Sequence, residues 1–325
     1  MQIRKAVITA AGSGVRLYPA SDTVQKAMLP FIDRDGLNKP LIQIIAEEAL
    51  DSGIEEICVV CSPGDESRYM ERFEAFRENL LAAYKGVEWA HLQEERLNNL
   101  MRRIHFAVQE KPLGYGHAVY CSREFVGGEP FLLLLGDHLY VSRIKGRRCA
   151  QQLIDLAVLE ECSVAAVQTT PEHQVRYYGT LSGKRVPKHE NVYQIEHILE
   201  KPSLSVAEQE VHVPGLRVGH YLCFFGMHVL TKTIFEILEK GISSGTKMNG
   251  EFQLTPSLRR LAQDEKYLAL ELKGSRYDIG APHGMMKAQL ALSLAGRDRD
   301  QVLVELMELL AGVNRIRIEE PEAGE

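Results

Sequence analysis

The stretch PFLLLLGDH, residues 130–138, is apolar without a break from Phe131 to Leu135 and then turns polar. A strand with one face in water alternates apolar and polar residues, whereas an unbroken apolar run indicates a strand covered on both faces. Such strands are typical of parallel sheets whose two faces are covered by helices. The stretch therefore predicts a buried strand in the sheet of an α/β protein.

Short apolar segments alternate with helical patterns on both sides of this stretch. Residues 4–10 and 54–62 are predicted strands, and the segment between them has a helical apolar face that ends at Gly53. The same alternation predicts strands at 104–110 and 163–170, and helices at about 66–84, 116–123 and 147–160. This order predicts a doubly wound, Rossmann-like sheet that is mixed but mostly parallel.

The pattern changes after Pro171, where turn-rich strand segments predict a small β-rich part. Residues 203–216 are acidic and are predicted to be irregular, and 299–313 read as an amphipathic helix followed by an acidic tail. No repeat or convincing linker interrupts the chain before this helix. We therefore predict one domain over 1–296 and a C-terminal extension over 297–325.

Composition excludes several classes of protein. The 325 residues are 45% hydrophobic and 25% charged, which is average for a globular protein. No apolar run approaches the ~20 residues that span a bilayer, and the first residues lack a signal-peptide pattern, so we expect a cytoplasmic protein without a membrane partner. The net charge of -6 argues against a nucleic-acid partner, although a basic pocket for one small anion stays open.

The six cysteines are scattered, and Cys58 and Cys61 form the one close pair. This spacing also occurs in metal and redox sites, but here it lies within a β-branched apolar run. Residues three apart on a strand face opposite sides, so the two thiols should diverge. We expect buried, reduced cysteines and no disulfide framework.

A glycine pair follows the first predicted strand in the segment AAGSGVR, residues 10–16. Glycines at the end of a strand let backbone N–H groups approach phosphate oxygens. The third glycine of a dinucleotide-binding loop is absent, because Leu17 stands in its place, and the P-loop pattern is missing as well. By itself the pair could equally be a tight strand-to-helix turn.

Two cations accompany the glycine pair. Arg16 can grip phosphates as a planar fork, and Lys26 can add a point charge to the same oxygens. Either cation alone would more often be a solvated surface charge. Together beside a glycine turn, they favour a triphosphate.

The whole segment from the first strand through QKAMLP, residues 25–30, resembles the start of the sugar-phosphate nucleotidyltransferases. Members of this family have a glycine loop with an arginine, followed by a lysine before Met-Leu-Pro. The resemblance extends over about residues 3–295. Three of its segments look most like the bacterial UTP-glucose-1-phosphate uridylyltransferases: the long charged insertion at roughly 66–104, GHAV at 116–119 and EFQLT at 251–255.

Two further segments match the family in the expected order. Residues 109–118, QEKPLGYGHA, are similar to the segment in which a glutamine and a glycine recognise a pyrimidine base. An amide offers both a donor and an acceptor, which suits the imide edge of uracil or thymine. Residues 200–202, EKP, resemble the motif that binds a sugar 1-phosphate, and Gly179 belongs to the Tyr-Gly pair upstream that lets the sugar lie against the backbone.

Two aspartates are candidates for a magnesium site. Asp137 ends the buried strand, and Asp278 lies in YDIG, residues 277–280, which resembles a second acidic motif of the family. Mg²⁺ binds one or two carboxylates together with substrate phosphates. An aspartate before a helix is by default an N-cap, and this alternative is strongest for Asp278.

The resemblance thus implies Mg²⁺-dependent transfer of a nucleotidyl group, most simply UMP from UTP, to a sugar 1-phosphate such as glucose 1-phosphate. We also expect a homo-oligomer, either a dimer or a tetramer. The C-terminal helix is a candidate contact between subunits, and the alternative that it packs on its own domain stays open. The implied site residues are Arg16, Lys26 and Asp137 for catalysis; Ala11, Gly12, Ser13, Gly14, Gln109 and Gly114 for the nucleotide; Gly179, Glu200 and Lys201 for the sugar phosphate; and Asp137 and Asp278 for the metal.

Several departures from the family pattern leave alternatives open. Val15 stands where the loop has Thr or Ser, Gln25 replaces a proline, and His220 replaces an arginine. The GDH triplet at 136–138 is nearer to the thymidylyl branch. A thymidylyltransferase and a non-catalytic binding relative therefore remain alternatives, and a nicotinamide dehydrogenase lacks its third loop glycine and its acidic ribose reader.

Overall fold

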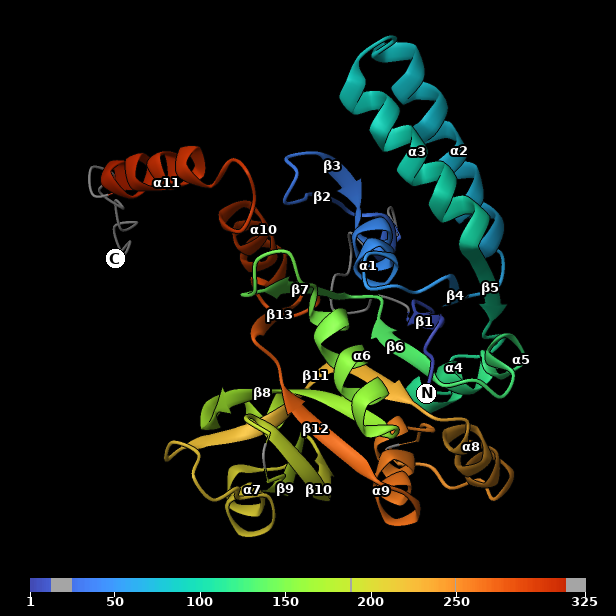
Figure 1. Cartoon of the computed structure of the whole chain (residues 1–325), viewed down its shortest axis with the longest axis vertical. Coiled ribbons are helices and arrows are strands. Elements are labelled where there is room, and N and C mark those ends of the chain that lie inside the picture. The colour runs from blue at the N-terminus through green and yellow to red at the C-terminus, as the bar shows by residue number, and fades with distance from the viewer. Residues whose placement is uncertain (13–24, 188, 249, 314–325) are drawn as a thin grey trace, which may run out of the picture.

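The computed structural model describes residues 1–12, 25–187, 189–248 and 250–313. A nine-stranded sheet runs through the molecule in the order β5-β4-β1-β6-β11-β8-β12-β10-β9 (Figure 1). In that order the strands are Ile104–Val108, Glu56–Cys61, Lys5–Thr9, Phe131–Leu135, His220–Leu230, Ser163–Pro171, Tyr267–Glu271, Val192–Glu200 and Gly179–Arg185. The strands predicted from unbroken apolar runs are thus confirmed.

Helices cover both faces of this sheet. Residues that alternate along β1 and β6 enter two separate cores: Ile8 and Leu134 face α1 (Leu41–Leu50) and α6 (Cys149–Glu160). Val7 and Leu133 face α4 (Tyr115–Cys121), α8 (Thr233–Ser243) and α9 (Leu254–Asp264). This two-sided burial is why the central strands carry no polar alternation.

The mixed α/β class is confirmed, but the sheet is less parallel than the sequence predicted. Among the described strands of the nine-stranded sheet, four pairings are parallel and five are antiparallel. β11 runs antiparallel between β6 and β8, and β9 returns directly into β10. Only the short segment 186–191 joins β9 to β10, and so short a connection permits an antiparallel pair alone. An unbroken apolar run indicates that a strand is buried, but it does not indicate whether the strand runs parallel or antiparallel to its neighbours.

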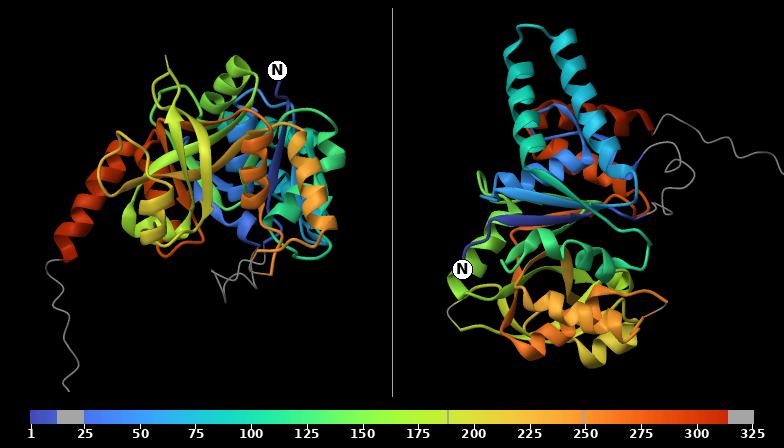
Figure 2. Two further views of the ribbon diagram at one scale, coloured as in Figure 1. Left: turned by 90° about the horizontal axis from the view of Figure 1, so that it is seen from below. Right: turned by 90° about the vertical axis from the view of Figure 1, so that its right-hand side faces the viewer.

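Two predicted segments differ from the structure. Residues 203–216 were expected to be irregular, but Ser203 caps a short helix, α7 (Leu204–Glu210), by accepting a hydrogen bond from the Val206 N–H. The charged insertion contains two helices, α2 (Asp65–Ala83) and α3 (Glu88–Arg103), which form a hairpin that projects from the body (Figures 1 and 2). Both contain many charges because most of their surface faces water.

The remaining elements are short or lie at the ends of the chain. They are a 3-10 turn at Lys26–Met28, β2 (Pro30–Ile32), β3 (Asn38–Pro40), α5 (Arg123–Val126), β7 (His138–Ser142), a second 3-10 turn at Glu172–Tyr177, β13 (Gly274–Asp278), α10 (Gly284–Leu294) and α11 (Arg299–Val313). α11 extends away from the body (Figures 1 and 2). The predicted boundary after residue 296 stays a prediction.

The cysteines behave as the strand geometry predicts. Cys58 lies in the core beneath α4 and α9, whereas Cys61 lies in the opposite core beneath α1. All six cysteines lie in the described ranges, and all are free. Among the described residues, no helix is both long enough and apolar enough to cross a membrane.

A buried lysine holds the hairpin of β2 and β3 on helix α1. The Lys39 side chain is fully buried, and its Nζ lies 2.9 Å from Asp33, 2.6 Å from Asp35 and 2.8 Å from Glu47. Burial alone would lower the pKa of Lys39, but Glu47 and Asp33 outweigh it and raise the pKa. Because the hairpin directly follows Lys26–Met28, this ion cluster fixes one end of the segment that contains Lys26.

We predict that Lys39→Ala lowers the free energy of unfolding by about 3–5 kcal/mol, because it leaves the carboxylates of Asp33 and Glu47 buried without their cation. Urea denaturation measures the change. Lys184→Ala is the control, since Lys184 pairs with Glu196 on the exposed surface and its loss should change stability little. Equal effects of the two substitutions would show that the cluster is not a stabilising unit.

Candidate active site

A cavity of about 960 Å³ opens at the carboxyl ends of β1 and β6. This edge is where open α/β sheets bind their ligands. β1 and β6 pair in parallel, with Thr9 opposite Leu135. The Gly136 N–H then donates to the Thr9 carbonyl at 2.9 Å. A Cβ at Gly136 would lie 2.6 Å from that oxygen, so only glycine lets the chain turn Asp137 into the cavity here.

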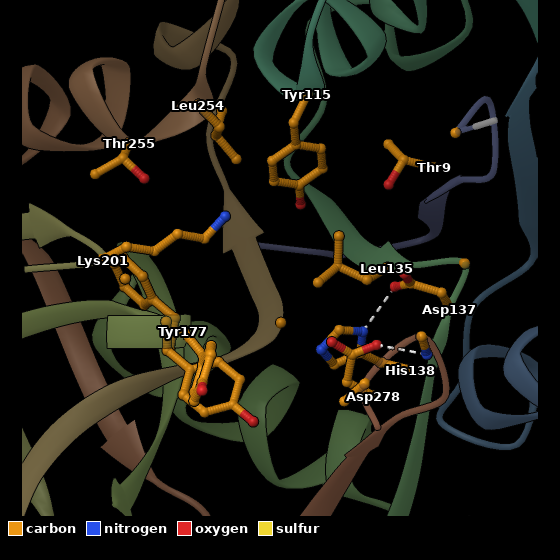
Figure 3. A pocket seen from close by; sticks show the side chains of 18 of the residues that line it. Thr9, Tyr115, Leu135, Asp137, His138, Tyr177, Lys201, Leu254, Thr255 and Asp278 are labelled. Carbon is orange, nitrogen blue, oxygen red and sulfur yellow. Dashed lines mark hydrogen bonds and ion pairs between the residues drawn. The ribbon is translucent and has the colours of Figure 1, made fainter. Parts of the chain in front are cut away.

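Asp137 lies between a lysine and a histidine. Its carboxylate oxygens lie 2.7 Å from Lys26 Nζ and 2.7 Å from His138 Nδ1, and the contact with His138 is drawn in Figure 3. Burial alone would raise the pKa of Asp137, but His138 and Lys26 outweigh it and hold the pKa far below its usual range. Asp137 therefore stays ionised at every physiological pH.

Asp278 reaches the same place from the other end of the sequence. β13 pairs antiparallel with β7, and this register sets Asp278 opposite His138. One ligand atom each from Asp137, His138 and Asp278 lies within 4.8 Å of the others. Asp278 Oδ1 also accepts the Gly280 N–H at 2.8 Å in a local turn. The next helix, α10, begins at Gly284 with His283 at its N-cap position, so the alternative of Asp278 as a helix N-cap is wrong. Two carboxylates on separate elements thus converge on one point.

The opposite wall of the cavity comes from the antiparallel pair β9 and β10. Their register puts Glu200 beside Gly179, and the Thr255 hydroxyl at the start of α9 donates to Glu200 Oε2 at 2.5 Å. Lys201 has φ +46°, a left-handed backbone that side chains rarely adopt, and Figure 3 shows its amine pointing into the cavity. Strain of this kind at a cavity wall is typical of functional positions.

Gly179 has a local packing reason as well as its predicted role. A Cβ at this position would lie 2.6 Å from the ring of Phe224 on β11. The aromatic ring, which also lines the cavity, therefore occupies the space that a side chain would need. Glycine at 179 is required by the fold before any sugar binds.

The structure brings many of the predicted site residues together, but not all of them. The predicted residues that line the cavity are Gly12, Lys26, Asp137, Gly179, Glu200, Lys201 and Asp278. Ser13, Gly14 and Arg16, and the variant Val15, lie outside the described residues. The individual roles of all these residues stay predictions.

Ala11, Gln109 and Gly114 are not among the residues that line the cavity. Gln109 is buried, and its Nε2 donates to the Gly114 carbonyl at 3.1 Å and lies 3.0 Å from His117 Nδ1. Its amide nitrogen therefore braces the segment before α4. The recognition of a pyrimidine base by Gln109 stays a prediction.

Sequence reasoning missed several cavity residues, among them Thr9, Tyr115 and Tyr177. Thr9 is the last residue of a strand, and Tyr177 ends a short 3-10 turn, so no motif marks either of them. Tyr115 lies inside a segment that the sequence singled out, between two glycines. Its place between two glycines of a motif is the signal that could have drawn notice to it.

The geometry defines a class of site: a cavity at the carboxyl edge of an α/β sheet, with Lys26 beside the paired carboxylates on one wall and Lys201 on the opposite wall. The sequence matches the model of the nucleotidyl transferase family over residues 5–293. The chain belongs to this family.

Curated relatives match along nearly the whole chain. One named UTP–glucose-1-phosphate uridylyltransferase YngB, from Bacillus subtilis, is 35% identical over 95% of this chain and 96% of its own length. A UTP–glucose-1-phosphate uridylyltransferase of Streptococcus pneumoniae is 36% identical over 90% of this chain and 91% of its own length.

Solved structures of UDP-glucose pyrophosphorylases have a similar fold. A UDP-glucose pyrophosphorylase complexed with UDP-glucose has a TM-score of 0.70 at 30% identity, over 89% of this chain and 98% of that one. The UDP-glucose pyrophosphorylase of Acinetobacter baumannii has a TM-score of 0.75 at 25% identity, over 95% of this chain and all of that one.

We predict that Gly284→Ala destabilises the fold by about 1–3 kcal/mol, because a methyl group at this position would lie 2.1 Å from the Asp278 carbonyl. The backbone that presents Asp278 would have to move. Gly312→Ala is the matched control, since a Cβ at this helical position meets nothing within 4 Å and should stabilise by up to about 1 kcal/mol. Thermal and urea unfolding measure both, and a neutral Gly284→Ala would contradict the close approach.

Proposed function

We propose that the chain is an Mg²⁺-dependent uridylyltransferase that joins UMP from UTP to glucose 1-phosphate, giving UDP-glucose and pyrophosphate. The observation that carries the proposal is the convergence of Lys26 and Lys201, from opposite walls, on a cavity that also holds two carboxylates. A site with this arrangement suits two phosphate-bearing substrates. The names and coverage of the relatives support the choice of UTP and glucose 1-phosphate.

The reaction requires no proton transfer from the protein. An oxygen of the sugar phosphate attacks the α-phosphorus of UTP, a new P–O bond forms, and the bond to the bridging oxygen breaks as pyrophosphate leaves. Because the nucleophile is already an anion, the barrier comes mainly from repulsion between negative groups and from positioning. Fixed cations reduce this repulsion and hold the reacting groups in position.

We assign the charged residues of the site to steps of this reaction. Lys201 would hold the phosphate of glucose 1-phosphate, and Glu200 would accept hydrogen bonds from sugar hydroxyls. Lys26, whose amine contacts Asp137 in the ligand-free chain, would turn to the α-phosphate once the nucleotide binds in the cavity. Arg16, which lies outside the described residues, is proposed to hold the outer phosphates.

The donor set at Asp137 and Asp278 fits Mg²⁺. This ion prefers carboxylate oxygens and shares its coordination with substrate phosphates, and the two carboxylates converge on one point beside His138. When bound, the ion supplies positive charge that offsets repulsion between the reactants. The low pKa of Asp137 keeps its oxygens available as ligands without competition from protons.

A pyrophosphate-release assay of UTP, dTTP, CTP and ATP with glucose 1-phosphate and other sugar 1-phosphates tests the function. We expect the highest kcat/KM for UTP with glucose 1-phosphate, and a loss of about 10²-fold or more in Asp137→Asn. Asp155→Asn is the control, because Asp155, on α6, is a half-exposed carboxylate paired with Arg147. Binding of UTP without pyrophosphate release, or full activity of Asp137→Asn, would contradict the proposal.

We also propose that the chain forms a homo-oligomer, a dimer or tetramer, through α11. Val304, Met307, Leu309 and Leu310 are between 49% and 66% exposed, and no residue of α11 up to Gly312 is buried. Val304, Met307 and Leu310 recur every three residues and so lie along one side of the helix. A second copy of the same helix would cover this apolar side.

The oligomer is tested by light scattering of the full chain at micromolar concentration. Met307→Glu combined with Leu310→Glu should shift the mass toward the monomer, because burial of four charges in a two-fold contact is unfavourable. Leu159→Glu, at a 69% exposed position on α6, serves as the control and should leave the mass unchanged. A monomeric wild type would contradict the proposal.

A further inference from the structure

Tyr115 presents a buried hydroxyl to the cavity. It is the first residue of α4, and Figure 3 shows its hydroxyl pointing into the cavity, with Lys201 on one side and Asp137 on the other. The oxygen is shielded from solvent and makes no hydrogen bond of normal geometry to any described residue. The Thr9 hydroxyl lies close enough to lower the pKa of Tyr115 slightly against the effect of burial, but the two hydroxyls do not meet that geometry.

The backbone around Tyr115 fixes the direction of its side chain. The Gly116 N–H donates to the Phe252 carbonyl at 2.8 Å, and the Phe252 N–H donates to the Leu113 carbonyl at 2.8 Å. A Cβ at Gly114 would lie 2.8 Å from the Phe252 carbonyl oxygen. The start of α4 is therefore held against the segment before α9, which fixes the position of the Tyr115 backbone relative to the cavity.

A buried donor without a partner destabilises a folded chain, so such groups in native structures usually have a functional reason. Burial raises the pKa of the Tyr115 hydroxyl, and the charges of Asp137 and Glu200 raise it further. The Tyr115 hydroxyl therefore stays neutral and can donate a hydrogen bond. Because both Asp137, at the proposed metal end, and Glu200, at the proposed sugar end, act on this hydroxyl, it lies where a ligand oxygen between the two ends can accept its hydrogen bond.

We propose that the Tyr115 hydroxyl donates a hydrogen bond to the phosphate that carries the sugar, both in the sugar 1-phosphate and in the nucleotide sugar. The inference rests on the proposed function and adds a residue that selects the second substrate. A phosphate oxygen is the acceptor that this position favours, because the Lys201 amine points into the cavity beside the Tyr115 hydroxyl and would attract an anion there (Figure 3). Hydrogen bonds to an ionised acceptor are the stronger kind.

Tyr115→Phe removes this hydroxyl and keeps the ring. Calorimetric titration of the full chain with UDP-glucose should show binding weakened about tenfold, whereas binding of UTP, which lacks the sugar-linked phosphate, should be unchanged. In the pyrophosphate-release assay, the KM for glucose 1-phosphate should rise by a similar factor and the KM for UTP should not. Tyr120→Phe is the matched control on the same helix, because the Tyr120 hydroxyl donates to Glu239 at 3.0 Å on the exposed surface.

The melting temperature of the ligand-free chain separates recognition from a structural role. Loss of an unsatisfied hydroxyl should leave the melting temperature of Tyr115→Phe equal to or above that of the wild type. A lower melting temperature, unchanged affinity for UDP-glucose, or an equal loss for UDP-glucose and UTP would each overturn the inference. A wild-type chain that binds neither nucleotide would overturn the proposed function as well, so the two failures are distinguishable.

Discussion

The parallel pairing of β1 with β6 is the constraint on which the rest of the structure depends. Both strands are buried on both faces, so their side chains leave no freedom in register. The pairing brings the Thr9 carbonyl against Gly136, and the chain can pass this point only without a side chain. Asp137 follows at once, which means that the position of a key carboxylate is set by the packing of the core.

The site is polarised before any ligand arrives. Lys26 and His138 hold Asp137 as an anion, Thr255 holds Glu200, and Lys201 adopts a strained backbone at the end of β10. Each arrangement costs stability in the isolated chain through desolvation, strain or lost side-chain entropy. The buried cluster around Lys39 and the two apolar cores offset this cost elsewhere, as is expected where function departs from the best packing.

The sequence predicted the buried strands and the opposite directions of Cys58 and Cys61 well, because burial and strand periodicity are local properties. It predicted sheet direction less well: β11 has the same composition whether it runs parallel or antiparallel to β6. It missed α7, whose acidic residues resemble a loop, although Ser203 supplies a capping signal. Gln109 fitted the base-reading motif, yet its amide nitrogen braces the backbone before α4.

By itself the sequence determined the α/β class, the glycine and lysine segment at the start, and the order of motifs that marks a nucleotidyl transferase. These features are short and local, so residue types and spacing are sufficient to indicate them. Only the tertiary structure decided that Asp278, from the strand β13, meets Asp137, and that Tyr115 turns a buried hydroxyl toward the same cavity. Contacts between distant segments depend on strand register and on the crossing of elements, and spacing along the chain contains neither.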